Sequence, residues 1–176
     1  MPNTSDYERL LDAIGWNILT ELQENARIQL AELGRRVGLS NPAVIERVRR
    51  MEEAGIITGY RAEIDYRKVG LPVCAFIRVR VIGNLMPRVI EVAKKMPEVY
   101  ECHRISGEDT FLLKVYVPTS EALERTVDKL TPYVATTTML VFSSPVTRRA
   151  IERHIDGETA PVHPAPRKKR KPSKRY

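Results

Sequence analysis

The chain has 176 residues, of which 43% are hydrophobic and 29% charged, a composition typical of globular proteins rather than of disordered chains. Its length suits one large domain or two small ones. No apolar run approaches the roughly eighteen residues of a membrane span, and no signal-peptide pattern opens the chain. We therefore expect a soluble, cytoplasmic protein with no membrane partner.

The formal net charge of +7 comes from one end of the sequence. Residues 160–176 hold seven Lys or Arg and no acid, whereas the other 159 residues hold 22 bases and 22 acids. This C-terminal stretch is rich in proline and lacks apolar periodicity, so we expect residues 151–176 to be a basic, disordered tail. Such a tail either only aids solubility or forms an arm that adds sequence-independent affinity for DNA.

Near the N-terminus, apolar residues recur at helical spacing and predict a first helix of about three turns. Asp6 and Asp12 fall near its start. The repeating positions are Leu10, Leu11, Ile14, Ile18, Leu19 and Leu22.

Residues 30–55 show the pattern of two short helices joined by a tight turn. Gly38 interrupts the first helical repeat, Ser40 occupies the N-cap position of the second helix, and Pro42 falls in its first turn. Gly55 follows the second repeat and suits the left-handed backbone of a helix cap. The apolar positions are Leu30, Leu33 and Val37 in the first helix and Val44, Val48 and Met51 in the second.

Positive charge gathers on this helix-turn-helix pattern. Between Arg27 and Arg50 the sequence has six Arg and two Glu, a local net charge of +4, although residues 1–60 together hold seven Arg and nine acids. Concentrated positive charge is typical of a phosphate-binding surface. We therefore favour a DNA-binding helix-turn-helix over an ordinary helical hairpin whose arginines form a solvated face.

Residues 56–64 predict a short hairpin-like wing or a connecting strand, because apolar and β-branched residues flank Thr58-Gly59. Residues 61–72 end with Gly70 and Pro72, which are typical of a linker. We thus expect a DNA-binding domain over residues 1–60 and a second domain over residues 73–150.

The second domain alternates strand and helix patterns. The order strand, helix, strand, strand, helix, strand is that of a split βαβ, ferredoxin-like unit, so the chain as a whole is predicted to be α+β. The third strand lacks the glycine and paired rings of the RNA-recognition version of this topology, which excludes that function. The predicted strands are 73–81, 99–106, 110–117 and 134–144, and the predicted helices are 86–96 and 120–130.

Three stretches resemble the Lrp/AsnC family of bacterial and archaeal transcription regulators. They are LLDAIGWNILTELQENARIQLAELGRRVGLS, ERVRRMEEAGIITGYRAEID, and ECHRISGED followed by FLLKVYVP. The resemblance spans about residues 10–146. It implies dimers formed through the ferredoxin-like domains, often stacked into octamers, and paired winged helix-turn-helix domains that bind double-stranded DNA. It also implies amino acids or related small metabolites as effectors, bound where dimers meet.

The resemblance also implies which residues contact DNA. Arg47 and Arg50 fall on or beside the face opposite the apolar positions, so replacing both is expected to spare the fold and weaken DNA binding. Glu46 would accept a hydrogen bond from a cytosine amine or hold Arg50 in place. The residues expected to face or approach DNA are Ser40, Asn41, Pro42, Ala43, Glu46, Arg47, Arg49 and Arg50.

A second set of residues is implied around the effector, in one pocket. Backbone N–H groups of the Gly107 loop would bind a carboxylate, and an acidic side chain would bind an ammonium group. Many family members have Asp three residues after this glycine, where the present chain has Thr110. The residues expected at the pocket are Gly107, Glu108, Asp109, Thr136 and Thr138.

Two other site types fit the sequence poorly. The candidates for a metal site lack the usual ligand spacing, and an intracellular pair of cysteines is better explained as reduced, small apolar residues. The acidic residues between Glu101 and Asp109 have no accompanying nucleophile–base pattern or phosphate loop, so we expect neither catalysis nor a cofactor. The metal candidates are Cys74, Cys102, His103 and His154.

The sequence thus predicts a homo-oligomeric, sequence-specific transcription regulator whose oligomer arrangement is shifted by a small amino-acid-like effector. The alternative is an architectural nucleoid protein that binds DNA broadly without an effector. The basic tail favours the alternative, whereas the Gly107–Asp109 loop and the threonines of the last strand favour the regulator.

Overall fold

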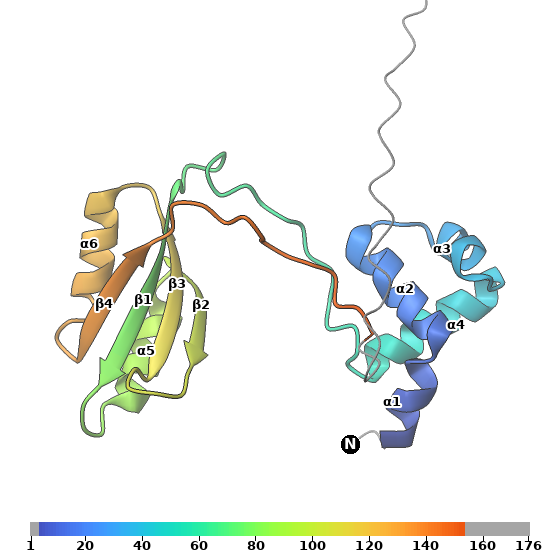
Figure 1. Cartoon of the computed structure of the whole chain (residues 1–176), viewed down its shortest axis with the longest axis horizontal. Coiled ribbons are helices and arrows are strands. Elements are labelled where there is room, and N and C mark those ends of the chain that lie inside the picture. The colour runs from blue at the N-terminus through green and yellow to red at the C-terminus, as the bar shows by residue number, and fades with distance from the viewer. Residues whose placement is uncertain (1–3, 154–176) are drawn as a thin grey trace, which may run out of the picture. The chain divides into compact units, whose positions relative to one another are not determined.

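The computed structural model describes residues 4–153, so the predicted disorder of the tail from residue 154 onward lies outside the described residues. The chain forms two compact units, which are residues 1–61 together with the segment that starts at Arg148, and residues 62–147. Figure 1 shows both units. No helix in the described part of the chain is long and apolar enough to cross a membrane.

The first unit begins with two helices, α1 (Thr4–Leu10) and α2 (Ala13–Glu24), where the sequence predicted one. Asp12 separates the two helices. Its Oδ1 accepts a hydrogen bond from the Gly15 N–H at 2.8 Å and so caps the start of α2. Gly15 makes the corner tight, since a Cβ at this position would lie 1.8 Å from the Leu10 carbonyl oxygen. The predicted helix of about three turns is confirmed as α2, whereas the separate helix α1 was not predicted.

The helix-turn-helix is confirmed as α3 (Leu30–Val37) and α4 (Asn41–Glu53). Gly55 has a φ of +71° and ends α4 as predicted. The Ile56 N–H donates to the Met51 carbonyl at 2.9 Å, the bond that defines a Schellman cap. The core of this unit consists of Leu10, Ile18, Leu22, Leu33, Val37, Val44, Val48 and Met51.

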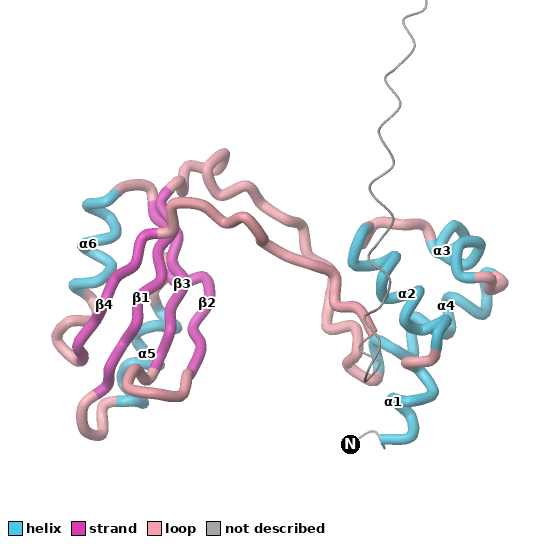
Figure 2. Tube along the Cα trace, viewed as in Figure 1, coloured by secondary structure: helices cyan, strands magenta, loops and turns pink. Residues whose placement is uncertain are grey.

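Residues 54–72 contain turns but no strand (Figure 2). Neither the hairpin-like wing nor the connecting strand predicted for residues 56–64 is formed in the described chain. Gly59, with a φ of +150°, interrupts the extended run, and a two-stranded hairpin without further strands is marginally stable in water.

The second unit has the predicted element order. The four strands form an antiparallel sheet in the order β2-β3-β1-β4. In Figure 1, α5 lies behind this sheet and α6 is drawn beside β4. The elements are β1 (Val73–Val81), α5 (Met86–Lys95), β2 (Val99–Arg104), β3 (Phe111–Val117), α6 (Ser120–Asp128) and β4 (Val134–Leu140).

Alternation along the strands gives the sheet two different faces. Ile77, Leu113 and Val115 point toward the helices and are fully buried. Their neighbours in sequence point the other way, onto an open face that no described helix covers. Apolar residues on that open face are Cys74, Phe76, Leu112 and Tyr116, and all four are half-buried.

After β4 the chain returns to the first unit. The Gln23 side chain on α2 accepts from the Ile151 N–H at 2.7 Å and donates to the Ile151 carbonyl at 3.1 Å. Residues 148–153 therefore belong with the helix-turn-helix, whereas the sequence assigned residues up to 150 to the second domain and began the tail at 151.

Candidate DNA interface and effector site

The outer face of α4 is fixed by the burial of Val44, Val48 and Met51 on its inner face. Ile45 lies on the outer side with 43% of its surface exposed, and the sequence prediction omitted it. Because Ile45 directly follows the buried Val44, its position in the helical repeat could have predicted that it lies outside the buried face. An exposed apolar side chain there suits a thymine methyl group. The exposed residues of the predicted DNA set are Ser40, Asn41, Pro42, Ala43, Glu46, Arg49 and Arg50.

Ser40 is the N-cap of α4, as predicted, but its side chain makes no capping hydrogen bond. Pro42 explains part of this, because it has no N–H at one of the two positions to which a capping oxygen normally binds. The Ser40 hydroxyl is thus left for another partner at the positive end of the α4 dipole.

Arg47 is not a DNA-facing side chain in this structure. Its Nη2 lies 2.7 Å from Asp12 Oδ1 and donates to the carbonyls of Arg9 and Leu10 at 2.8 and 3.4 Å. The guanidinium therefore joins α4 to the corner between α1 and α2. The hydrogen bond from the Gly15 N–H is the main cause that lowers the pKa of Asp12, and the hydrogen bond from Arg47 lowers this pKa further. The expectation that replacing Arg47 spares the fold is not supported.

Glu46 pairs with Arg49 rather than with Arg50, which corrects one alternative given for it. Arg49 Nη2 lies 2.7 Å from Glu46 Oε1, and Arg49 also pairs with Glu53. The hydrogen bond from Arg49 lowers the pKa of Glu46. These exposed contacts neutralise Arg49 in the absence of DNA.

The basic surface is smaller than the sequence window indicated. The window ended at Arg50, whereas α4 continues through Glu52 and Glu53 and so holds three Arg and three Glu. On α3, Arg36 lies 2.7 Å from Glu21 and 2.9 Å from Glu32. Among the arginines of α4, Arg50 alone makes no ion pair with any residue that the structure describes.

The tip of the β2–β3 hairpin brings Glu108 and Asp109 against two arginines of β1. Asp109 Oδ2 lies 3.1 Å from Arg78 Nε, and Asp109 Oδ1 lies 3.9 Å from Arg80 Nε. Glu108 also pairs with Arg80. The four side chains form a charge-balanced cluster, which offers carboxylates to an ammonium group and guanidiniums to a carboxylate.

Thr110, which stands where an acid was expected, extends the sheet. Its N–H donates to the Val79 carbonyl at 2.7 Å, and its hydroxyl accepts from the Val81 N–H at 3.2 Å. This side chain therefore continues the pairing of β1 and β3 beyond Phe111.

The two threonines of the predicted pocket lie on the other face of the sheet. Thr136 is opposite Val79 and Thr138 is opposite Ile77, and residues directly opposite each other share a face. The helices pack on that face, although Thr138 on the edge strand stays exposed, whereas Arg78 lies on the open face. The single pocket predicted for the five effector residues therefore does not form within one chain.

The cysteines lie on opposite faces of the sheet, since Cys74 is opposite Tyr116 and Cys102 is opposite Leu113. Both are free thiols. His154, the remaining distant candidate for a metal ligand, lies outside the described residues. Between residues 4 and 153 no three His, Cys, Asp or Glu side chains gather in a way that could hold a metal ion.

Comparison with known proteins defines the class. Residues 11–58 match the winged helix-turn-helix DNA-binding family, and residues 74–151 match the Lrp/AsnC ligand binding domain. The chain is therefore a DNA-binding transcription regulator with a ligand-binding domain, and not an enzyme.

Similarity to individual relatives identifies the family of the chain. The chain is 38% identical over 133 residues to the HTH-type transcriptional regulator LrpC of Bacillus subtilis, covering 76% of this chain and 92% of the relative. It is 39% identical to the leucine-responsive regulatory protein of Escherichia coli over 119 residues, covering 65% of this chain and 72% of the relative. The chain belongs to the Lrp/AsnC family.

A solved structure supports the same assignment. The transcriptional regulator of Neisseria meningitidis, crystallised as its L-Met complex, matches with a TM-score of 0.76 and 31% identity. The match covers 80% of this chain and 96% of that one.

We expect Arg47→Ala to destabilise the first unit by roughly 1–3 kcal/mol, because it removes a half-buried charged hydrogen-bond donor shared by three acceptors. The matched control is Arg49→Ala, whose exposed ion pairs should contribute less than about 1 kcal/mol. Urea unfolding followed by the fluorescence of Trp16, the single tryptophan, reports on this unit. Equal unfolding midpoints for the two variants would contradict the role given to Arg47.

Proposed function

We propose that this protein is a sequence-specific, effector-responsive transcription regulator that inserts α4 into the major groove of DNA. A major groove is wide enough to admit one α-helix. The observation that carries the proposal is that Ser40 at the N-cap and Ile45 and Arg50 on α4 are exposed. Their side chains make no hydrogen bond or ion pair with the described residues, while Arg47 and Arg49 are held by acids.

Each exposed group on α4 suits a different part of DNA. Arg50 has the planar fork that binds two acceptors on a guanine edge. Ile45 and Ala43 suit thymine methyl groups. Ser40 and Asn41 begin the helix, where hydroxyl and N–H groups bind phosphate oxygens. Arg47 then acts as a positioning residue that sets the angle of α4.

The effector in this proposal is an amino acid. The cluster of Arg78, Arg80, Glu108 and Asp109 contains two positive and two negative groups, so a zwitterion can replace internal pairs with its own carboxylate and ammonium. The L-Met complex of the Neisseria meningitidis relative is consistent with this chemistry. Thr136 and Thr138 would join the same pocket only where a second subunit brings them to it.

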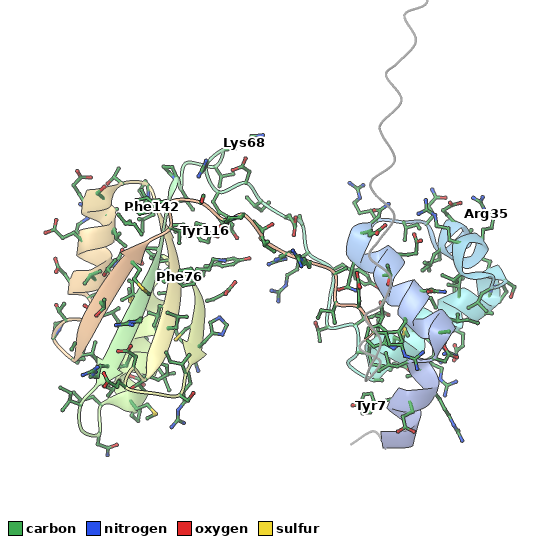
Figure 3. All side chains as sticks on the ribbon, in the orientation of Figure 1. Tyr7, Arg35, Lys68, Phe76, Tyr116 and Phe142 are labelled. Atoms are coloured by element: carbon green, nitrogen blue, oxygen red, sulfur yellow. The ribbon has the colours of Figure 1, made fainter. Side chains whose placement is uncertain are left out.

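The open face of the sheet is the proposed dimer interface. Tyr66 stacks on Tyr116 with ring centroids 3.8 Å apart, and Tyr100 meets both rings edge-on. Figure 3 labels Phe76 and Tyr116 on this sheet, and also Phe142, which is 90% exposed. Large exposed apolar surfaces of this kind mark protein interfaces, and a closed dimer buries the same patch from both subunits. Further stacking into octamers is part of the proposal.

Regulation then follows from a shift between arrangements of the oligomer. An effector that binds one arrangement more tightly increases its population, and only this difference in affinity can change how the DNA-binding units are spaced.

Arg50→Ala should weaken binding to a target duplex by roughly 1–3 kcal/mol and relax specificity at one base pair. The control is Arg125→Ala, which removes an exposed helical arginine from the other unit. Fluorescence anisotropy with the target and with single-base variants measures both effects. Unchanged affinity for the target would refute the assignment of α4.

Addition of the effector should raise the melting temperature, because a ligand present at a hundred times its dissociation constant stabilises the native state by about 2.7 kcal/mol. A thermal-shift screen with the twenty amino acids tests this. Asp109→Asn should abolish the shift, while Glu91→Gln on α5 should preserve it. If no amino acid shifts the wild-type protein, the architectural alternative without an effector gains support.

Phe76→Asp should convert dimers to monomers, because it places a carboxylate at the centre of the proposed apolar interface. Arg125→Asp on α6 introduces the same group on the opposite side of the sheet and should leave the dimer intact. Light scattering at micromolar concentration measures the mass. A monomeric wild-type protein would rule out the interface.

A further inference from the structure

Tyr66 is the one half-buried residue in the stretch 58–70, which connects α4 with β1, and the other twelve residues are exposed. Its ring stacks on Tyr116 of β3 with the centroids 3.8 Å apart and the ring planes at 15°. It also meets the ring of Tyr100 edge-on, with the centroids 5.3 Å apart. Aromatic pairs of these geometries stabilise a contact beyond the area that they bury. Tyr66 therefore fixes the connecting stretch to the open face of the sheet.

The turn around Tyr66 is closed by hydrogen bonds of its own backbone. The Lys68 N–H donates to the Asp65 carbonyl at 3.0 Å, and the Leu71 N–H donates to the Tyr66 carbonyl at 2.8 Å. Residues 65–71 therefore form a compact turn that leads directly into β1. Because the turn is closed, the stack on β3 holds the whole of it and not the ring alone.

The other end of this connection is held by α4. The Tyr60 hydroxyl donates to Glu52 Oε1, near the end of α4, at 2.9 Å. Five residues, 61–65, lie between Tyr60 and Tyr66, so the two are joined by a segment of at most roughly 20 Å when fully extended. The proposed recognition helix is thus joined to the open face of the sheet through five residues.

A second connection between the two units is longer. After β4 the Val141 N–H donates to the Cys74 carbonyl at 2.9 Å, and Gln23 holds Ile151 through two hydrogen bonds. Nine residues, 142–150, lie between Val141 and Ile151. The connection that contains Tyr66 therefore sets the tighter limit on how far the first unit can move.

We propose that Tyr66 is a positioning residue for DNA binding: its stack on Tyr116 fixes where the connecting segment leaves the sheet, and so determines which spacings of two half-sites a dimer can bind at once. The proposal rests on the dimer and the DNA binding proposed above, and it adds a determinant of half-site spacing. Without the stack, as many as twelve residues, 61–72, separate Tyr60 from β1 instead of five. Because effective concentration falls roughly as the −3/2 power of linker length, this release should weaken binding at the preferred spacing about fourfold.

The test uses the full-length chain and duplexes that carry two copies of one half-site. The half-site is taken from duplexes that the wild-type protein selects out of a random pool. The distance between the two copies is varied in single base pairs over one helical turn of about 10.5 base pairs. Fluorescence anisotropy measures the affinity for each spacing, for a duplex with a single half-site and for an unrelated duplex. Light scattering measures the mass of each protein.

Three further variants accompany Tyr66→Ala. Tyr66→Phe keeps the stacked ring and is the conservative rescue. Val69→Ala is the matched control, since it truncates a side chain of the same turn that is 58% exposed. Gln23→Ala releases the longer connection, and it should change the spacing preference less than Tyr66→Ala does, because nine residues already separate the contacts of that connection.

We expect Tyr66→Ala to bind its best two-site duplex about fourfold more weakly than the wild-type protein does. The ratio between the affinities for the best and the worst spacing should fall by at least the same factor, because a longer segment reaches unfavourable spacings more easily. Affinity for the single half-site should not change, since α4 is unaltered. A role of Tyr66 in stability alone would not produce this combination. Tyr66→Phe and Val69→Ala should match the wild-type protein in every measurement.

Four outcomes would overturn the proposal. They are an unchanged spacing preference in Tyr66→Ala, the same loss in Tyr66→Phe, an equal or larger effect of Gln23→Ala, and a monomeric Tyr66→Ala, which would assign the ring to the subunit interface instead. The function proposed for α4 is judged separately, by the ratio of half-site to unrelated affinity in the wild-type protein. A wild-type protein that binds both equally would refute that function, and the present proposal with it.

Discussion

The packing of α4 against the corner between α1 and α2 determines which side chains of this protein can reach DNA. Gly15 permits the corner because any Cβ there would meet the Leu10 carbonyl and the end of Met51. Arg47 then closes it, with one guanidinium nitrogen shared between Asp12 and two backbone carbonyls. Because this arginine and the apolar inner face of α4 are occupied by contacts within the fold, the groups available for the proposed DNA recognition are those that project outward.

The ion pairs that arginines make within the first unit reduce its positive surface charge. Arginines that hold acids within the fold cannot neutralise phosphates without first losing those partners, so the ion pairs of Arg36 and Arg49 weaken the basic surface that their presence suggests. Exposed pairs of this type are weak, and DNA phosphates can compete for them. The return of the chain to Gln23 joins Ile151 to the same unit through both of its backbone groups.

The two faces of the sheet in the second unit carry different groups of residues. The face under α5 and α6 supplies the core, while the open face carries the tyrosine group and the Arg78–Asp109 cluster. The proposed interface and the proposed effector cluster thus share one surface, so a ligand that rearranged the charged cluster would act on the surface through which subunits are proposed to meet. That proximity provides a direct route from effector binding to oligomer arrangement.

The sequence by itself determined the order and type of most elements, the recognition helix and its cap at Gly55, because helical and strand periodicity and the preferences of glycine and proline are local. It also indicated the family. Only the tertiary structure decided that Asp12 separates α1 from α2, that Glu46 holds Arg49, and that Arg47 serves the fold. It likewise put the threonines of β4 on the opposite face from Arg78 and joined Gln23 to Ile151 across 128 positions. Arg47 with Asp12 and Gln23 with Ile151 join residues far apart in sequence, about which a local pattern contains no information. Asp12 with Gly15 and Glu46 with Arg49 are three residues apart, and there the structure selected one of several local pairings that the sequence allows.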